Sequence, residues 1–316
     1  MTSDLDSERE EAIDEIVEGV VDCFFSEFRK ALSHVKVPQT EKDYHDYVWR
    51  FIEKNLSQHY QRGDPFVEEL VKNAAAHAKD LTQEYDLKAE VTPKVVIMAL
   101  YDFVILCDDS GSMKRGGRIQ SLQDTCQCVA DIAGLLQPQG ISLRFLNYPD
   151  DQHFDQLASQ DDIKSKMSGV TYKGFTRLGT VLGSKITEPL ILNKAKLNQF
   201  KRPVITIIIT DGCPSGEPND YFQQAILNCK KGLSQLPFEP ASAIFIISRV
   251  GNDPDAEIFL SDLRMSKDLE GMLYCCKQQL DLQQEVFRRA GNGNQYSSFL
   301  IKLFSEALEG QADTDW

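Results

Sequence analysis

Three oxygen-bearing side chains alternate along the segment that reads CDDSGSM at 107–113. They are Asp108, Ser110 and Ser112, and they follow directly on an apolar run at 103–106. Carboxylates and hydroxyls at the end of a buried strand need partners, because an unpaired buried charge is costly. Either the backbone satisfies these groups or a cation lies among them. For this segment alone, helix caps and turns explain Asp and Ser better than a metal does.

Two further segments offer the same kind of side chain. Thr176 lies in GFTRLGT, on a loop before a predicted helix, and Asp211 directly follows the strand-like run PVITIIIT. With these two residues, the candidate set contains five oxygen-bearing side chains and no His or Cys. Such a set suits a hard cation, Mg²⁺ or Mn²⁺. The three segments together therefore favour a metal site over isolated caps and turns.

The elements that must position these segments alternate between strand and helix. Runs that are apolar on both faces predict strands at 101–107, 140–147, 203–210 and 241–250. Helical patterns lie at about 119–136, 160–168, 178–186, 218–233, from Pro254 onward and at 296–309. This alternation predicts an α/β fold with a doubly wound, mostly parallel, Rossmann-like sheet covered on both faces. In such sheets ligands bind beyond the carboxyl ends of the strands, where the candidate residues lie.

The N-terminal part of the chain shows a different, purely helical pattern. Apolar positions recur at helical spacing over 8–35, 41–60 and 65–81. Pro65 suits a helix start, and the turn before it explains the Arg-Gly-Asp tripeptide at 62–64. We expect these helices to pack on the sheet domain, because a large exposed apolar stripe would be a liability. The predicted divisions are a helical region at 1–96, a sheet domain at 97–310 and an acidic tail at 311–316.

Composition and charge exclude several classes of function. The formal net charge of −14 argues against a nucleic-acid binder, which needs a basic patch, and favours divalent cations and basic partner surfaces. The longest apolar run, at 95–107, is too short to span a bilayer and contains Asp102. The acidic N-terminus lacks the basic start of a signal peptide. The eight cysteines show no C-x-x-C zinc spacing, so we expect reduced thiols in an intracellular, cytoplasmic protein.

With these segments in this order, the chain resembles the von Willebrand factor A (vWA) family. The segments DDSGS, GFTRLGT and TDG are similar to that family's metal-ion-dependent adhesion site (MIDAS), and the resemblance covers about 97–310. The segments ALYDFVILCDDSGSM, GISLRFLN and VGNDPDAEIFLSDL look most like an intracellular subgroup found in fungi. The resemblance implies that Ser110, Ser112 and Thr176 contact the ion directly. It implies that Asp108 and Asp211 act partly through water.

The same resemblance implies a function. Neutral hydroxyls leave the ion electrophilic, so it takes an anionic sixth ligand, which in the family is commonly a carboxylate of a partner protein. The chain departs from the family at Phe175 and Arg177. Arg177 would either reach the anionic ligand or fold back on Asp109 and weaken metal binding. We therefore expect a metal-dependent protein–protein interaction module with no catalytic residues. The residues do not indicate its partner or its oligomeric state.

Two alternatives stay open. A Mg²⁺-dependent phosphohydrolase of the haloacid dehalogenase type needs Asp-x-Asp, and Ser110 occupies the second position here. A P-loop does not fit either, because the glycine-bounded segment GSMKRGG has Gly where Lys is required. The other alternative is a scaffold whose metal site is empty, because metal affinity depends on geometry that residue spacing does not determine.

Overall fold

The computed structural model describes residues 37–85, 87, 89, 91–136, 140–149, 151–289 and 293–311. The helix predicted over 8–35 lies outside these residues, and so does the acidic tail after 311. Pro38–Asp315 form one compact unit. The domain boundary expected near residue 96 stays a prediction.

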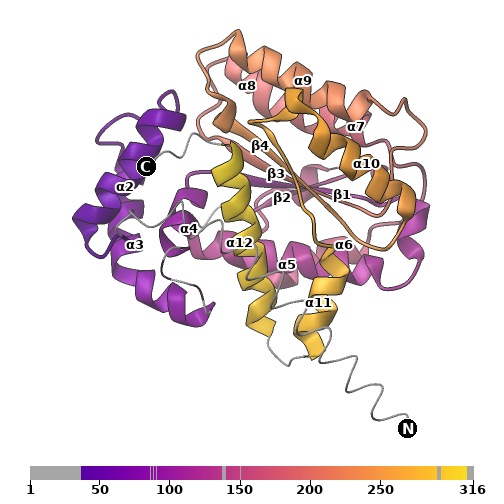
Figure 1. The fold of residues 1–316 in the computed structure, drawn as a ribbon, viewed down its shortest axis with the longest axis horizontal. Helices are drawn as coiled ribbons and strands as arrows, with labels where there is room; N and C mark the ends of the chain where they lie inside the picture. Colours follow the sequence, from indigo (N-terminus) through magenta and orange to yellow (C-terminus); the bar gives the residue numbers. More distant parts are fainter. Residues whose placement is uncertain are drawn as a thin grey trace. The chain divides into compact units, whose positions relative to one another are not determined.

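A five-stranded sheet, parallel throughout, forms the centre of this unit (Figure 1). Its strands are β1 (Asp102–Cys107), β2 (Ser142–Phe145), β3 (Val204–Thr210), β4 (Ala243–Arg249) and β5 (Leu273–Cys275). The spatial order is β2-β1-β3-β4-β5, so the direction of winding reverses between β1 and β3. The predicted α/β fold with a doubly wound parallel sheet is therefore confirmed.

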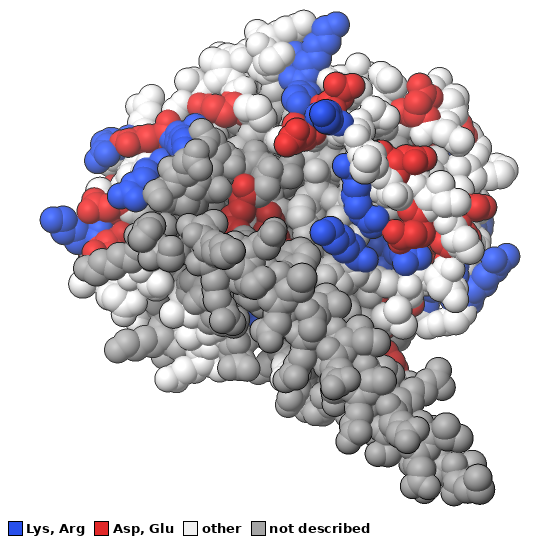
Figure 2. Space-filling view, in the orientation of Figure 1, with Lys and Arg blue, Asp and Glu red and all other residues white. Residues whose placement is uncertain are grey.

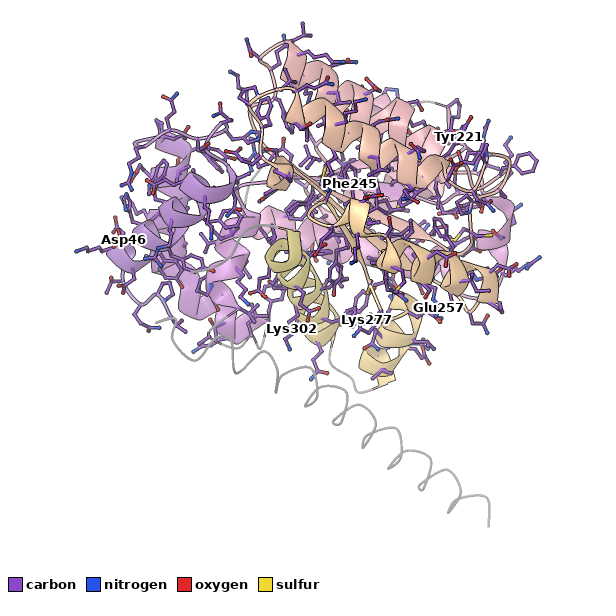
Figure 3. The ribbon with its side chains drawn as sticks, turned by 45° about the horizontal axis from the view of Figure 1, so that its top comes forward. Asp46, Tyr221, Phe245, Glu257, Lys277 and Lys302 are labelled. Atoms are coloured by element: carbon purple, nitrogen blue, oxygen red, sulfur yellow. The ribbon has the colours of Figure 1, made fainter. Side chains whose placement is uncertain are left out.

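The apolar runs explain the central strands. Every residue of β3 is buried, and most are the β-branched residues that suit a pleated surface. Phe245 of β4 is fully buried and lies within the layered core (Figure 3). The strand β5 was not predicted, because its three residues are too few to show a pattern of their own.

Helices cover both faces of the sheet, with α7 to α10 above it and α5, α11 and α12 below it in Figure 1. Their bounds are α5 (Arg118–Leu136), α6 (Gln160–Ser168), α7 (Leu178–Val181), α8 (Asn193–Lys196), α9 (Tyr221–Ser234), α10 (Pro254–Met265), α11 (Leu280–Arg289) and α12 (Gly293–Gln311). The start of α10 at Pro254 is as predicted, and the Asp253 side chain caps it by accepting from the Asp255 N–H at 2.9 Å. The helix α11 was not predicted.

The helix expected to end near 186 continues to Lys196. A π-helical segment, Leu182–Leu192, joins α7 to α8 and contains Pro189. Proline lacks an N–H donor and disrupts an α-helical ladder, and a wider π turn is one way to continue past it. At the start of this stretch Gly179 permits a close approach, because a Cβ there would lie 2.2 Å from the Tyr221 carbonyl carbon. The stretch therefore packs directly on the first turn of α9.

The remaining described helices are α2 (Glu41–Asn55), α3 (Pro65–Glu84) and α4 (Thr92–Met98). The segment between α2 and α3 docks near the amino ends of the central strands. The Tyr60 hydroxyl donates to the Leu100 carbonyl, just before β1. The His59 ring lies 4.9 Å from that of Phe200, before β3, and 5.1 Å from that of Phe238, before β4. This segment therefore packs on the sheet domain, whereas the apolar stripe at 13–24, for which packing was expected, lies outside the described residues.

Burial of His59 at this junction makes stability depend on pH. Its burial lowers its pKa to about 4, below the ordinary 6.5, although the backbone of Phe200 and Lys201 favours the charged ring. The unfolded chain therefore binds more protons than the folded chain between about pH 6.5 and pH 4, and stability falls as the pH falls through that window.

We predict that His59→Phe will reduce this loss. Between pH 7 and pH 5 its free energy of unfolding, measured by urea denaturation, should fall by roughly 1–2 kcal/mol less than that of the wild type. His153→Gln, a change at an exposed histidine, is the control and should follow the wild type. An equal pH loss in the wild type and His59→Phe would contradict the prediction.

Candidate metal centre

The candidate residues gather at the carboxyl ends of two adjacent strands. Asp108 follows β1 directly and Asp211 follows β3, and these strands pair in parallel up to Cys107 opposite Ile209. After Asp108 the chain turns into a short 3₁₀ helix at Gly111–Lys114, which carries Ser112. The turn is closed by the Ser110 N–H, which donates to Asp108 Oδ1 at 2.8 Å.

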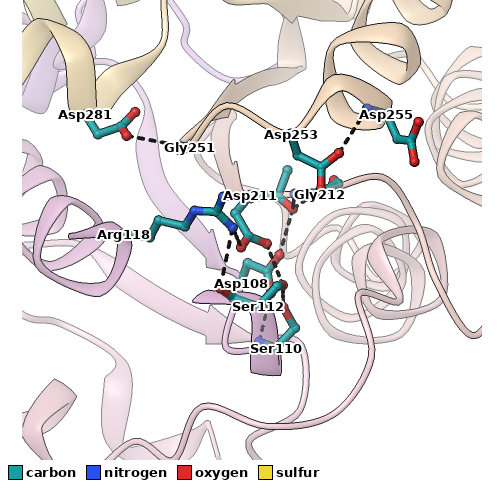
Figure 4. A network of polar contacts seen from close by, with 11 residues as sticks. Asp108, Ser110, Ser112, Arg118, Asp211, Gly212, Gly251, Asp253, Asp255 and Asp281 are labelled. Atoms are coloured by element: carbon teal, nitrogen blue, oxygen red, sulfur yellow. Dashed lines mark hydrogen bonds and ion pairs between the residues drawn. The ribbon is translucent and has the colours of Figure 1, made fainter. Parts of the chain in front are cut away.

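Hydrogen bonds join four of the five predicted residues into one network (Figure 4). The Ser110 and Ser112 hydroxyl oxygens lie 2.9 Å apart. The Ser112 hydroxyl donates to Asp211 Oδ1 at 2.8 Å. Asp108 Oδ2 accepts from the Thr210 hydroxyl at 2.7 Å, which ties the end of β1 to the end of β3. The structure therefore brings Asp108, Ser110, Ser112 and Asp211 together.

Thr176 lies in a loop beside this network without joining it. The loop is held by the Gly111 N–H, which donates to the Gly174 carbonyl at 3.4 Å. Thr176 itself is buried, and its N–H donates to the Ser215 hydroxyl at 3.0 Å. Within the described part of the chain, no hydrogen bond joins the Thr176 hydroxyl to the other four side chains.

Burial sets the electrostatics of the two neighbouring aspartates. Asp108 is fully buried, and this burial raises its pKa to about 6 although Ser110 and Thr210 hydrogen-bond to it. Asp109 is also buried, and its pKa is raised by burial. Its carboxylate is held away from the network by Asn147, which donates to Asp109 Oδ1 from the backbone at 2.7 Å and from the side chain at 3.1 Å.

An arginine that sequence reasoning missed supplies positive charge to the network. Arg118, the first residue of α5, forms an ion pair with Asp211 Oδ2, and its Nη1 lies 3.4 Å from the Ser112 carbonyl oxygen. The arginine that we expected to act here was Arg177, which is exposed and forms no ion pair within the described residues. Arg118 and Asp211 are 93 positions apart in the chain, so no local spacing could have indicated the pair.

The donor set fits a hard cation better than a soft one. Within the described ranges, no group of three or more His, Cys, Asp or Glu side chains could hold a metal ion. A metal at this edge would therefore depend on hydroxyls together with two carboxylates, which is the preference of Mg²⁺ and Mn²⁺. Burial of Asp108 adds to the fit, because a neighbouring cation would favour the charged form that burial disfavours.

Comparisons with known proteins do not identify the family. No model of a known protein family matches the chain, and no curated protein matches it. In the part of the chain that the structure describes, no helix is both long and apolar enough to cross a membrane.

Asn147 links two loops of the candidate site. Besides holding Asp109, its side-chain amide donates to the Phe175 carbonyl at 3.0 Å, next to Thr176. Gly174 gives this amide its space, because a Cβ at Gly174 would lie 2.3 Å from Asn147 Oδ1. Asn147 was not predicted as a site residue, since a single Asn after a strand carries no distinctive signal.

We predict that Asn147→Ala will lower the free energy of unfolding by about 1–3 kcal/mol, because it removes one of the two donors to a buried carboxylate. Urea denaturation at pH 7.5 measures the change. Asn219→Ala, which alters an exposed loop amide, should change stability by less than about 0.5 kcal/mol. Equal effects of the two substitutions would show that Asn147 does not hold the loops.

Proposed function

We propose that this chain is a vWA-type domain whose MIDAS binds Mg²⁺ or Mn²⁺ and, through the ion, a carboxylate of a partner protein. The observation that carries the proposal is the hydrogen-bonded cluster of Asp108, Ser110, Ser112 and Asp211 beyond β1 and β3. This edge lies where the winding of the sheet reverses, which is the usual ligand position in open α/β sheets.

Each residue would have a distinct part in holding the ion. Ser110 and Ser112 offer neutral oxygens from one rigid turn, and Thr176 offers a third from the neighbouring loop. Asp108 is fixed by the Ser110 N–H and the Thr210 hydroxyl, so its carboxylate is already oriented before a ligand arrives. The bound ion would supply the positive charge that attracts an anionic group of the partner.

The surroundings of the cluster support a protein partner. Phe175, next to Thr176, is 62% exposed, and Tyr221 is 47% exposed. Tyr221 lies at the start of α9 (Figure 3). Phe175 packs against Gly216, where a Cβ would lie 2.9 Å from its ring. Exposed aromatic side chains of this kind are enriched in protein interfaces. On the face drawn in Figure 2, basic and acidic side chains are interspersed, so this face offers no extended basic surface for nucleic acid.

The proposal places the protein in the cytoplasm and assigns it no catalysis. All seven cysteines in the described residues are free thiols, which supports a reducing compartment. For a phosphohydrolase the second carboxylate would have to stand at Ser110, which instead carries a buried hydroxyl 2.9 Å from that of Ser112. A scaffold with an empty site is the second candidate. It is favoured by the Arg118–Asp211 ion pair, which neutralises one carboxylate without a metal.

Calorimetric titration of Mg²⁺ and Mn²⁺ into the full chain tests the proposal. We predict that the wild type binds the metal and that Asp108→Asn weakens binding at least about tenfold, because it removes a charge beside the ion. Asp109→Asn is a matched control with the same change in charge one residue away. The Asp109 carboxylate accepts hydrogen bonds from Asn147 and takes no part in the cluster, so metal affinity should stay within about threefold of wild type. Asp108→Asn binding as tightly as wild type would refute the site.

A further inference from the structure

We propose that Arg118 is a built-in competitor of the metal for Asp211, and that metal binding moves its guanidinium toward Asp281. This inference rests on the proposed function, because it concerns the regulation of the same site. Under this proposal the site has two states. In one state Arg118 pairs with Asp211, and in the other the metal takes Asp211 while Arg118 pairs elsewhere.

The first observation is the depth of the ion pair. The Arg118 side chain is 11% exposed and the Asp211 side chain is 0% exposed, so the pair is shielded from water. Asp211 Oδ1 accepts from Ser112 and Asp211 Oδ2 accepts from Arg118, so each oxygen has a donor (Figure 4). A cation that approaches Asp211 must therefore displace a donor or meet the charge of the guanidinium at close range.

The second observation is the charge balance of the cluster. Two carboxylates, Asp108 and Asp211, are buried at the same edge of the sheet, so they need positive charge or donors close by. Arg118 supplies the compensating charge that an ion would otherwise supply. Removing one partner of a buried pair leaves an uncompensated charge, so the cluster without Arg118 should require a cation more strongly.

The third observation is that the fold reserves space for the Arg118 side chain. Gly251 has φ +76°, a conformation that favours glycine, and a Cβ there would lie 2.3 Å from Arg118 Nε. The backbone after β4 therefore lies in direct contact with the Arg118 side chain. The Gly251 N–H donates to Asp281 Oδ2 at 3.0 Å, so this carboxylate lies beside the same glycine (Figure 4).

The fourth observation is an alternative place for the guanidinium. A cavity of about 520 Å³ opens beside the cluster, and Arg118 lies in its wall. The same wall includes Gly251, Gln279 and Asp281. Asp281 Oδ1 accepts from Gln279 Nε2 at 2.7 Å and its Oδ2 accepts from the Gly251 N–H, so a guanidinium that turns into this cavity would share the carboxylate with these two donors. The exchange keeps Arg118 paired, which lowers the cost of freeing Asp211.

Calorimetric titration of Mg²⁺ into the full chain at pH 7.5 tests the competition. Arg118→Gln should bind Mg²⁺ at least about tenfold more tightly than the wild type, which corresponds to about 1.4 kcal/mol. The matched control is Arg50→Gln, which removes the same charge from an exposed arginine of α2 that has no ion pair in the described residues. It should change affinity by less than about threefold. Asp281→Asn should act in the opposite direction and weaken Mg²⁺ binding, because it removes the alternative partner.

Thermal unfolding provides a second readout that does not depend on affinity. In EDTA, Arg118→Gln should unfold at a lower temperature than the wild type, because Asp211 loses its partner. Added Mg²⁺ should raise the midpoint more in Arg118→Gln than in the wild type. If Arg118→Gln does not fold, Arg118→Lys decides instead, because its shorter side chain loosens the pair and should also tighten Mg²⁺ binding.

The outcomes separate this inference from the proposed function. Tighter Mg²⁺ binding by Arg118→Gln than by both the wild type and Arg50→Gln supports the inference. Mg²⁺ binding by Arg118→Gln alone supports it as well. Equal or weaker binding by Arg118→Gln overturns it, while metal binding by the wild type leaves the proposed function standing. No Mg²⁺ binding by either protein overturns both.

Discussion

Two carboxylates at the ends of adjacent parallel strands are the constraint on which the rest of the structure depends. Parallel pairing of β1 with β3 brings Asp108 and Asp211 to the same edge of the sheet, far apart in sequence but next to one another in space. Neither can face water freely, because both are buried. Each surrounding element must therefore supply a donor or a positive charge, since buried carboxylates without partners would destabilise the fold.

The chain meets this constraint with groups from several elements. The turn after β1 donates a backbone N–H and two hydroxyls, and the end of β3 donates the hydroxyl of Thr210. The first residue of α5 adds a guanidinium, and the loop after β4 makes room for it by carrying a glycine. These contributions fix the loops at one edge of the sheet. They explain how groups of the chain itself supply partners for the two buried carboxylates.

The sequence predicted those features that have a pattern of their own. The strands β1 and β3 are long apolar runs, so they could be predicted together with the position of Asp108 and Asp211 at their ends. Short β5 has no such pattern, and the helical stretch past Pro189 contradicts the usual rule that proline ends a helix. Arg118 and Asn147 could not be predicted as site residues, because their partners are distant in sequence and only the tertiary fold identifies them.

The position of the segment between α2 and α3 has a consequence for the molecule as a whole. Its contacts lie before β1, β3 and β4, at the amino ends of the strands, whereas the polar cluster lies at their carboxyl ends. The two ends of the strands therefore differ. A segment of the same chain packs on their amino ends, whereas loops surround their carboxyl ends. A fluorophore or surface attachment placed on α2 would therefore lie near the amino ends of the strands and would not obstruct the polar cluster at their carboxyl ends.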